Sequence, residues 1–75
     1  MRLILDSKTS IFLNGNITIS CEGKYIYISL LNYEYTIHTH DALPLYNTIC
    51  SSIDRNEMFC DITKTILWHK RTLIK

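Results

Sequence analysis

The stretch Lys24–His40 (KYIYISLLNYEYTIHTH) alternates between apolar and polar residues, but the parity of the alternation changes at Asn32. Before Asn32 the aliphatic side chains stand at even positions, Ile26, Ile28 and Leu30, whereas after it the apolar set stands at odd positions. Successive side chains of a strand point to opposite faces, so one straight strand would separate the two sets. A hairpin with a two-residue loop brings both sets to one face, and we therefore predict an antiparallel hairpin.

The loop of this hairpin is predicted at Leu31-Asn32, and its position determines the pairs across the two strands. One face is apolar, with Leu30 opposite Tyr33, Ile28 opposite Tyr35 and Ile26 opposite Ile37. The other face is mixed, with Ser29 opposite Glu34, Tyr27 opposite Thr36 and Tyr25 opposite His38. A single strand over the same residues would span roughly 55 Å, which is too long for a domain of 75 residues.

Asn14-Gly15 is the strongest turn signal in the chain, and it predicts a hairpin between strands at 9–13 and 16–21. A two-residue loop would align Phe12 with the isoleucines of the next strand. A three-residue loop, with its glycine in the left-handed conformation, would align Ile11 with them instead. We favour the second loop because it gathers more branched apolar side chains on one face.

Glu22-Gly23 is predicted to be the loop that leads into the central hairpin. It would place Cys21 opposite Lys24, Ile19 opposite Ile26 and Ile17 opposite Ile28. With a first strand at Arg2–Asp6, these turns predict an antiparallel meander of four or five strands. The shared apolar face consists of Ile11, Ile17, Ile19, Cys21, Ile26, Ile28, Leu30, Tyr33, Tyr35 and Ile37.

A change to helical spacing follows the meander. Apolar residues recur at three- and four-residue intervals from Ala42 to Ile53, Asp41 is a good N-cap, and Pro44 falls within the first turn. We predict a helix at about residues 42–52 that packs on the apolar face of the sheet. Residues 54–57 (DRNE) are predicted to form a turn.

The C-terminal part of the chain is ambiguous between strand and helix. Met58–Ile62 alternates as a strand does, and residues 63–75 are rich in β-branched side chains, which favours a strand. The apolar residues of the same segment also fit one face of a helix capped by Asp61. The predicted fold is a single small α+β domain over residues 1–75: an antiparallel meander, one helix on its apolar face and a C-terminal strand or helix.

The small size of the chain limits the size of its hydrophobic core. A chain of 75 residues buries only about 60% of its unfolded surface, so a protein partner or a homo-oligomer would add stability.

Cys21, Cys50 and Cys60 lack metal-binding or redox spacing and are expected to be reduced, mostly buried thiols. The N-terminus lacks a signal-peptide pattern, and no apolar run approaches the about 20 residues of a membrane span. We expect a cytoplasmic protein without membrane contact.

Charge is distributed unevenly along the chain. Residues 1–62 carry four basic and seven acidic side chains, for a net charge of −3, whereas residues 63–75 carry four basic side chains and no acid. This basic segment could bind phosphate or an acidic protein surface. Its candidate contact residues are Lys64, Trp68, Lys70, Arg71 and Lys75.

The polar face of the central hairpin is the principal candidate binding surface. Tyrosines on a flat sheet can anchor a protein partner or stack on single-stranded bases. Cations are few on this face, which favours a protein partner. The alternative is that the C-terminal segment or a second subunit covers these tyrosines, in which case they are not a free binding surface. The candidate contact residues are Tyr25, Tyr27, Glu34, His38 and His40.

Catalysis and cofactor binding are not indicated by any motif. His38 and His40 could offer two imidazoles to a metal, with Glu34 further along the same face, but the missing ligands would have to come from the distant His69 or a cysteine. No cysteine has a catalytic context, and two glycines cannot build a phosphate loop. We expect a small non-enzymatic protein–protein interaction module without metal or cofactor. By analogy of composition it suits a viral or mobile-element accessory protein that inhibits a larger host complex. The alternative is a nucleic-acid-binding protein that uses residues 64–75.

Overall fold

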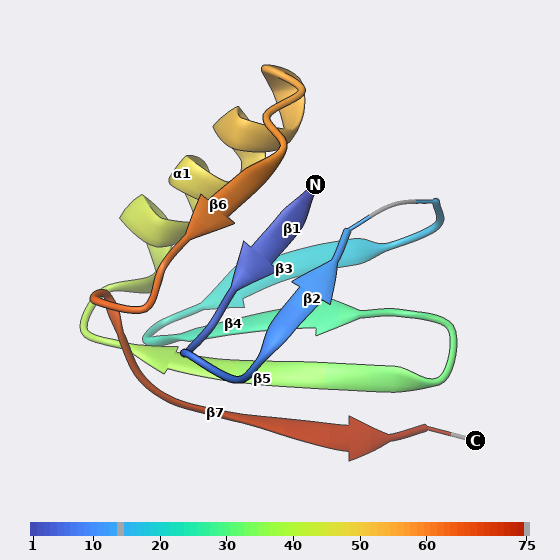
Figure 1. The fold of residues 1–75 in the computed structure, drawn as a ribbon. Coiled ribbons are helices and arrows are strands. Elements are labelled where there is room, and N and C mark those ends of the chain that lie inside the picture. Colours follow the sequence, from blue (N-terminus) through green and yellow to red (C-terminus); the bar gives the residue numbers. More distant parts are fainter. Residues whose placement is uncertain (14, 75) are drawn as a thin grey trace.

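Two sheets and one helix make up the fold in a computed structural model, which describes residues 1–13 and 15–74 (Figure 1). The large sheet has the strand order β3-β4-β5-β7, formed by Thr18–Glu22, Tyr25–Ser29, Tyr33–Thr39 and Ile66–Leu73. The small sheet has the order β2-β1-β6, formed by Ser10–Phe12, Arg2–Ile4 and Phe59–Asp61. Helix α1, Ala42–Asp54, follows β5 and precedes β6. The predicted α+β class is confirmed.

The central hairpin has the predicted loop and register. β4 and β5 are antiparallel neighbours, and the amide of Leu30 donates to the carbonyl of Tyr33 over 2.8 Å across the loop. Ile26 lies opposite Ile37, and Tyr25 lies opposite His38. The change of parity at Asn32 was therefore sufficient to predict this part of the structure.

The turn between β3 and β4 lies one residue later than predicted. The loop is Gly23-Lys24, so Cys21 pairs with Ile26 rather than with Lys24, and Ile19 pairs with Ile28. Gly23 has a φ of 63°, a conformation that glycine adopts without steric cost and that two-residue hairpin loops require. Because the register moves by two residues, the same side chains remain on the apolar face.

The predicted hairpin between residues 9–13 and 16–21 is wrong. β2 pairs antiparallel with β1, not with β3, and Ile11 lies opposite Leu3 in the small sheet. The reason is the tight turn after β1, where the Asp6 carboxylate accepts from the amide of Lys8 over 2.7 Å. Asn14, on which the predicted turn depended, lies outside the described residues.

Helix α1 begins where the sequence predicts and runs two residues further, to Asp54. Its N-cap Asp41 accepts a hydrogen bond from the amide of Leu43 over 3.4 Å, and Pro44 lies in the first turn. The chain leaves the helix through Asn56, whose φ is 60°. Asparagine tolerates this left-handed conformation better than most residues, which explains why the helix ends just before it.

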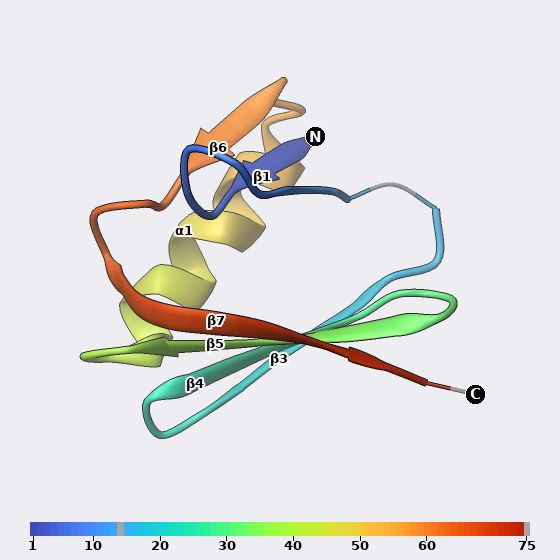
Figure 2. The same cartoon turned by 60° about the horizontal axis from the view of Figure 1, so that its bottom comes forward.

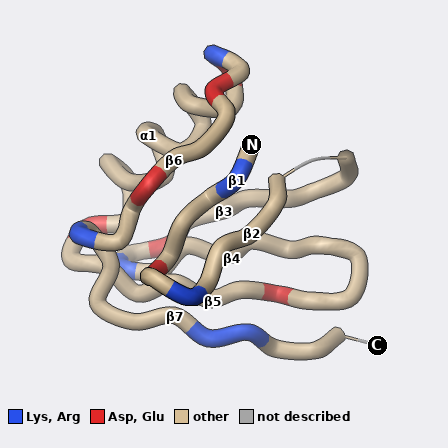
Figure 3. Tube along the Cα trace, viewed as in Figure 1, with Lys and Arg blue, Asp and Glu red and all other residues tan. Residues whose placement is uncertain are grey.

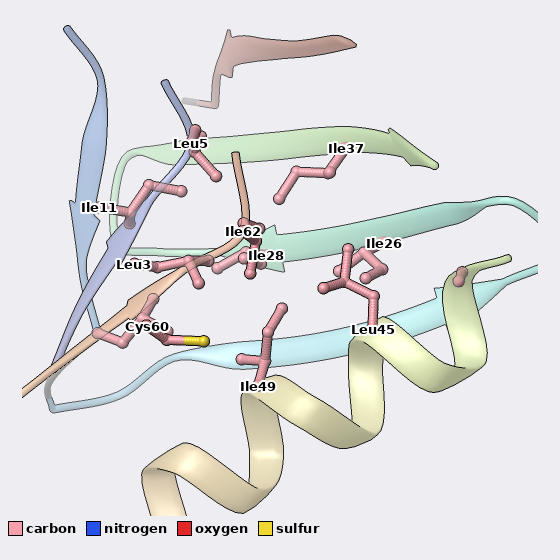
Figure 4. Packing of buried hydrophobic residues seen from close by; sticks show 12 residues of the cluster. Leu3, Leu5, Ile11, Ile26, Ile28, Ile37, Leu45, Ile49, Cys60 and Ile62 are labelled. Carbon is pink, nitrogen blue, oxygen red and sulfur yellow. The ribbon is translucent and has the colours of Figure 1, made fainter. Parts of the chain in front are cut away.

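The helix and the small sheet both pack on one face of the large sheet, which we call the inner face (Figure 2). Buried side chains from all three parts form one core, seen in Figure 4. They include Leu3, Leu5 and Ile11 around the small sheet, Ile26, Ile28 and Ile37 from the large sheet, Leu45 and Ile49 from α1, and Cys60 and Ile62 near β6. The prediction that α1 packs on the apolar sheet face is confirmed.

Tyr33 is a correction to the predicted core. Its parity is that of the inner face, yet 36% of its surface is exposed. It begins β5 at the end of the sheet far from α1, whereas Tyr35, two residues on, is partly buried against the core. Parity assigns a face to a side chain, but burial also requires an element above it.

The C-terminal segment forms a strand, so the helical alternative for residues 63–74 is wrong. β7 lies antiparallel to β5 and pairs Trp68 with His38, Thr36 with Lys70 and Glu34 with Thr72. An irregularity in the register occurs between His38 and Thr39. There the Thr39 hydroxyl donates to the carbonyl of Thr65 over 2.6 Å and anchors the start of the strand.

Candidate functional site: the outer face of the large sheet

The outer face of the large sheet is the one opposite α1 and the small sheet, and it brings together parts of the two surfaces proposed from the sequence. Residues directly opposite each other on neighbouring strands point to the same face. The register therefore places Trp68 and Lys70 of β7 on the face that carries Tyr25, Tyr27 and His38. No element of residues 1–13 and 15–74 packs on this face (Figure 2).

Four aromatic rings form a continuous cluster across β4, β5 and β7. The centroid of Tyr25 lies 4.9 Å from His38, 6.2 Å from Tyr27 and 6.2 Å from Trp68. His38 and Trp68 stack at 5.4 Å with their planes inclined by 24°. Such separations lie within the range in which aromatic pairs attract beyond simple burial. We call Tyr25, Tyr27, His38 and Trp68 the aromatic cluster.

The cluster is exposed at Tyr25 and Trp68 and closed around His38. Tyr25 retains 37% and Trp68 44% of its accessible surface, whereas His38 between them is partly buried. The Nδ1 atom of His38 is enclosed and has no hydrogen-bond partner within the described part of the chain. The large amphipathic rings are therefore presented to solvent on a rigid sheet.

Glu34 belongs to the same face but lies farther along β5. Its carboxylate accepts a hydrogen bond from the Ser29 hydroxyl over 3.2 Å across the hairpin. It is paired with Thr72, at the opposite end of the β5–β7 ladder from Trp68. Glu34 therefore lies on the outer face beside the aromatic cluster, and its side-chain hydrogen bond is with Ser29 and not with a cluster residue.

The other predicted site residues lie elsewhere. His40 follows β5 and lines a shallow groove with Lys64, Asp41 and Asp61. Arg71 has the parity of the inner face, and its guanidinium lies 4.8 Å above the ring of Tyr33. Lys75 lies outside the described residues. The basic segment is consequently not one surface, since strand alternation divides its cations between faces.

Lys70 and Trp68 join the aromatic face through the pairing of β7 with β5, which the sequence analysis did not predict. The alternation of Trp68, Lys70 and Thr72 could have indicated that they share a face. It could not have indicated which strand is their neighbour. That pairing connects residues distant in the sequence and depends on the path through α1 and β6.

The outer face is close to neutral. At the paired positions of the four strands its charged side chains are Glu22, Glu34 and Lys70, two acids and one base. A surface that tracks a nucleic-acid backbone needs several cations to replace the counterions of the phosphates. The balance of charge here does not provide them.

A metal site is not formed by the described residues. Within residues 1–13 and 15–74 no group of three His, Cys, Asp or Glu side chains is close enough to hold an ion. At Asp6 the hydrogen bond with His69 at 2.8 Å lowers the pKa of the carboxylate from 3.8 to about 2. This pair connects the β1–β2 turn to β7 on the inner side. His69 directly follows Trp68 in the strand and therefore points to the opposite face from the aromatic cluster.

Within the described part of the chain, no helix is long and apolar enough to span a membrane. Comparison with protein-family models, curated proteins and solved structures finds no match for this chain. The geometry of the outer face is therefore the basis for a functional proposal.

Proposed function

We propose that this chain is a non-enzymatic interaction protein that binds a protein partner through the outer face of the large sheet. The observation that carries the proposal is the aromatic cluster, exposed at Tyr25 and Trp68 on a face that none of the described elements covers. Tyrosine and tryptophan contribute disproportionately to protein interfaces, because they bury a large area with few rotatable bonds. Burial of this face would also supplement a small core.

A protein surface fits the outer face better than a nucleic acid does. Stacked bases would use the same rings, but the face carries one lysine and two glutamates. Hydroxyl and carboxylate groups around the cluster, at Ser29, Glu34 and Thr36, suit the polar rim of a protein interface. We propose that the chain acts by occupying a surface of its partner, as an accessory or inhibitory protein would. The three free thiols support an intracellular, reducing location.

The test compares partner affinity between matched aromatic substitutions. The full chain is used to capture partners from cells that contain it, and each partner is purified and titrated by calorimetry. We expect Tyr25→Ser combined with Trp68→Ser to weaken binding at least about 30-fold, the effect of losing one or two central aromatic anchors. Phe12→Ser is the control, because Phe12 is 65% exposed on the small sheet, away from this face.

Three other outcomes would replace the proposal. Unchanged affinity of the double variant would exclude the outer face as the binding surface. Binding to a generic oligonucleotide that weakens steeply with salt and depends on Lys70 and Arg71 would favour the nucleic-acid alternative. A homo-oligomer would be recognised by sedimentation, as an association that the same double substitution disrupts.

A further inference from the structure

Within residues 1–13 and 15–74, no strand pairs with the outward edge of the eight-residue strand β7 (Figure 1). This edge is one of the two edges of the large sheet, the other being the five-residue β3. Helix α1 contacts β3 on the inner face, and the β1–β2 turn contacts β7 on the same face through the hydrogen bond between Asp6 and His69. Neither of these contacts is a strand pairing at an outward edge. An exposed edge presents unpaired N–H and C=O groups that can accept another strand.

The backbone groups available at this edge follow from the register. The amide of Ile74 donates to the carbonyl of Asn32 over 2.8 Å, so Ile74 points its backbone toward β5. In an antiparallel ladder alternate residues point their N–H and C=O to the same side. Thr72 and Lys70 therefore also point toward β5, and His69, Arg71 and Leu73 point outward. These three residues offer a continuous ladder to an incoming strand.

The charge of β7 selects the occupant. Residues 63–74 carry Lys64, Lys70 and Arg71 and no acidic side chain, and Figure 3 shows a basic stretch, in blue, within β7. A second β7 from another copy would bring like charges opposite each other, which is unfavourable in a sheet. A phosphate backbone offers acceptors but no donors, so it would leave the outward carbonyls unpaired. An acidic extended peptide satisfies both the ladder and the charge.

We propose that the free edge of β7 binds an extended acidic segment of a protein partner as a fifth strand of the large sheet. Lys70 and Arg71 are adjacent and point to opposite faces, so the segment would carry two neighbouring acidic residues. A side chain on the outer face of the added strand would lie beside Trp68. This inference rests on the proposed function, because it names the part of the partner that contacts β7.

The test uses a synthetic probe and amide hydrogen exchange. The probe is a capped peptide of about eight residues, the length of β7, with alternating Thr and Val around a central Glu-Asp pair. At saturating peptide we expect at least tenfold slower exchange at the amides of His69, Arg71 and Leu73, with little change at Lys70 and Thr72. The same peptide with Lys-Lys at its centre should bind at least about fivefold more weakly.

The variants Arg71→Pro and Arg71→Gln distinguish the contribution of the backbone hydrogen bonds to peptide binding from that of the Arg71 charge. Both remove the guanidinium, but only proline removes the outward N–H, and an edge position tolerates proline. We expect Arg71→Gln to weaken peptide binding about two- to fivefold and Arg71→Pro to abolish it. If Arg71→Pro does not fold, a peptide N-methylated at alternate residues tests the same ladder on the native chain and should not bind.

Failure of strand addition is distinguishable from failure of the proposed function. Absence of peptide-dependent protection at the β7 edge, at millimolar peptide, would overturn the inference: the cations would then serve only to keep copies of the chain apart. Peptide binding that is lost in Tyr25→Ser but retained in Arg71→Pro would also overturn it, and would support the aromatic face. Partner affinity in the capture experiment decides the proposed function independently.

Discussion

His38 on β5 and Trp68 on β7 lie directly opposite each other, with ring centroids 5.4 Å apart and planes inclined by 24°. This pair joins two segments that the sequence treats as separate candidates, the tyrosine-rich hairpin and the basic C-terminal segment. Tyr25 contacts both rings and completes the cluster. The functional proposal depends on this one register.

In the free protein, the hydrogen-exchange rates of the backbone amides should alternate between slow and fast along β7. Lys70, Thr72 and Ile74 donate toward β5, so their amides should exchange slowly, whereas those of His69, Arg71 and Leu73 face solvent and should exchange quickly. Two-dimensional NMR after transfer to D₂O measures both sets. Protection of the three outward amides in the free monomer would contradict the open edge.

The core of the large sheet should be sensitive to truncation. Ile28 is fully buried between the two sheets and α1, so Ile28→Ala should lower the free energy of unfolding by about 2–5 kcal/mol, through lost burial and the cavity left behind. Leu31→Ala is the matched control, because Leu31 is 90% exposed in the β4–β5 loop. It should change stability by less than about 0.5 kcal/mol. Urea denaturation followed by circular dichroism measures both values.

The β3–β4 turn should require a left-handed residue at position 23. Gly23 has a φ of 63°, and no atom lies within 4 Å of the place that a Cβ would occupy. The cost of Gly23→Ala should therefore be conformational, about 1–2 kcal/mol. Gly23→Asn should cost less, since asparagine visits this region more readily. Equal stability of the alanine variant and the native chain in thermal unfolding would contradict the assigned turn.

Acid should destabilise the fold partly through Asp6. The hydrogen bond with His69 lowers the pKa of Asp6 from 3.8 to about 2, so the folded state holds this carboxylate in its charged form more strongly than the unfolded state does. Its contribution is complete above pH 3.8 and is lost as the pH falls through 2. Asp6→Asn should therefore lose less stability than the native chain between pH 4 and pH 2.

The measurement for Asp6 is urea unfolding at several pH values in that window. The variant should retain the pH dependence that arises from Glu57 and Asp61. The pKa of Glu57 is lowered by hydrogen bonds with Ser52 and Arg55, and that of Asp61 by hydrogen bonds with Thr63. Parallel stability curves for Asp6→Asn and the native chain would show that the contact with His69 is not maintained in solution.

Local pattern predicted the elements whose partners are close in the chain. The change of parity at Asn32 gave the β4–β5 register, and Asp41 with Pro44 gave the start of α1. For the β3–β4 turn the same reasoning placed the loop one residue too early. The same side chains still lie on the apolar face, because the register differs from the predicted one by two residues. These features depend on short-range sterics and on periodicity, which a single sequence contains.

The sequence by itself determined which side chains of β3, β4 and β5 share a face, because alternation is a property of the strand alone. Only the tertiary structure decided which strands are neighbours. It moved Ile11 into the small sheet, left Tyr33 exposed beyond the helix, and placed Trp68 beside His38. Each of these outcomes depends on how the helix and two sheets share one core, since burial is a contact between distant segments and leaves no periodic signal in either segment.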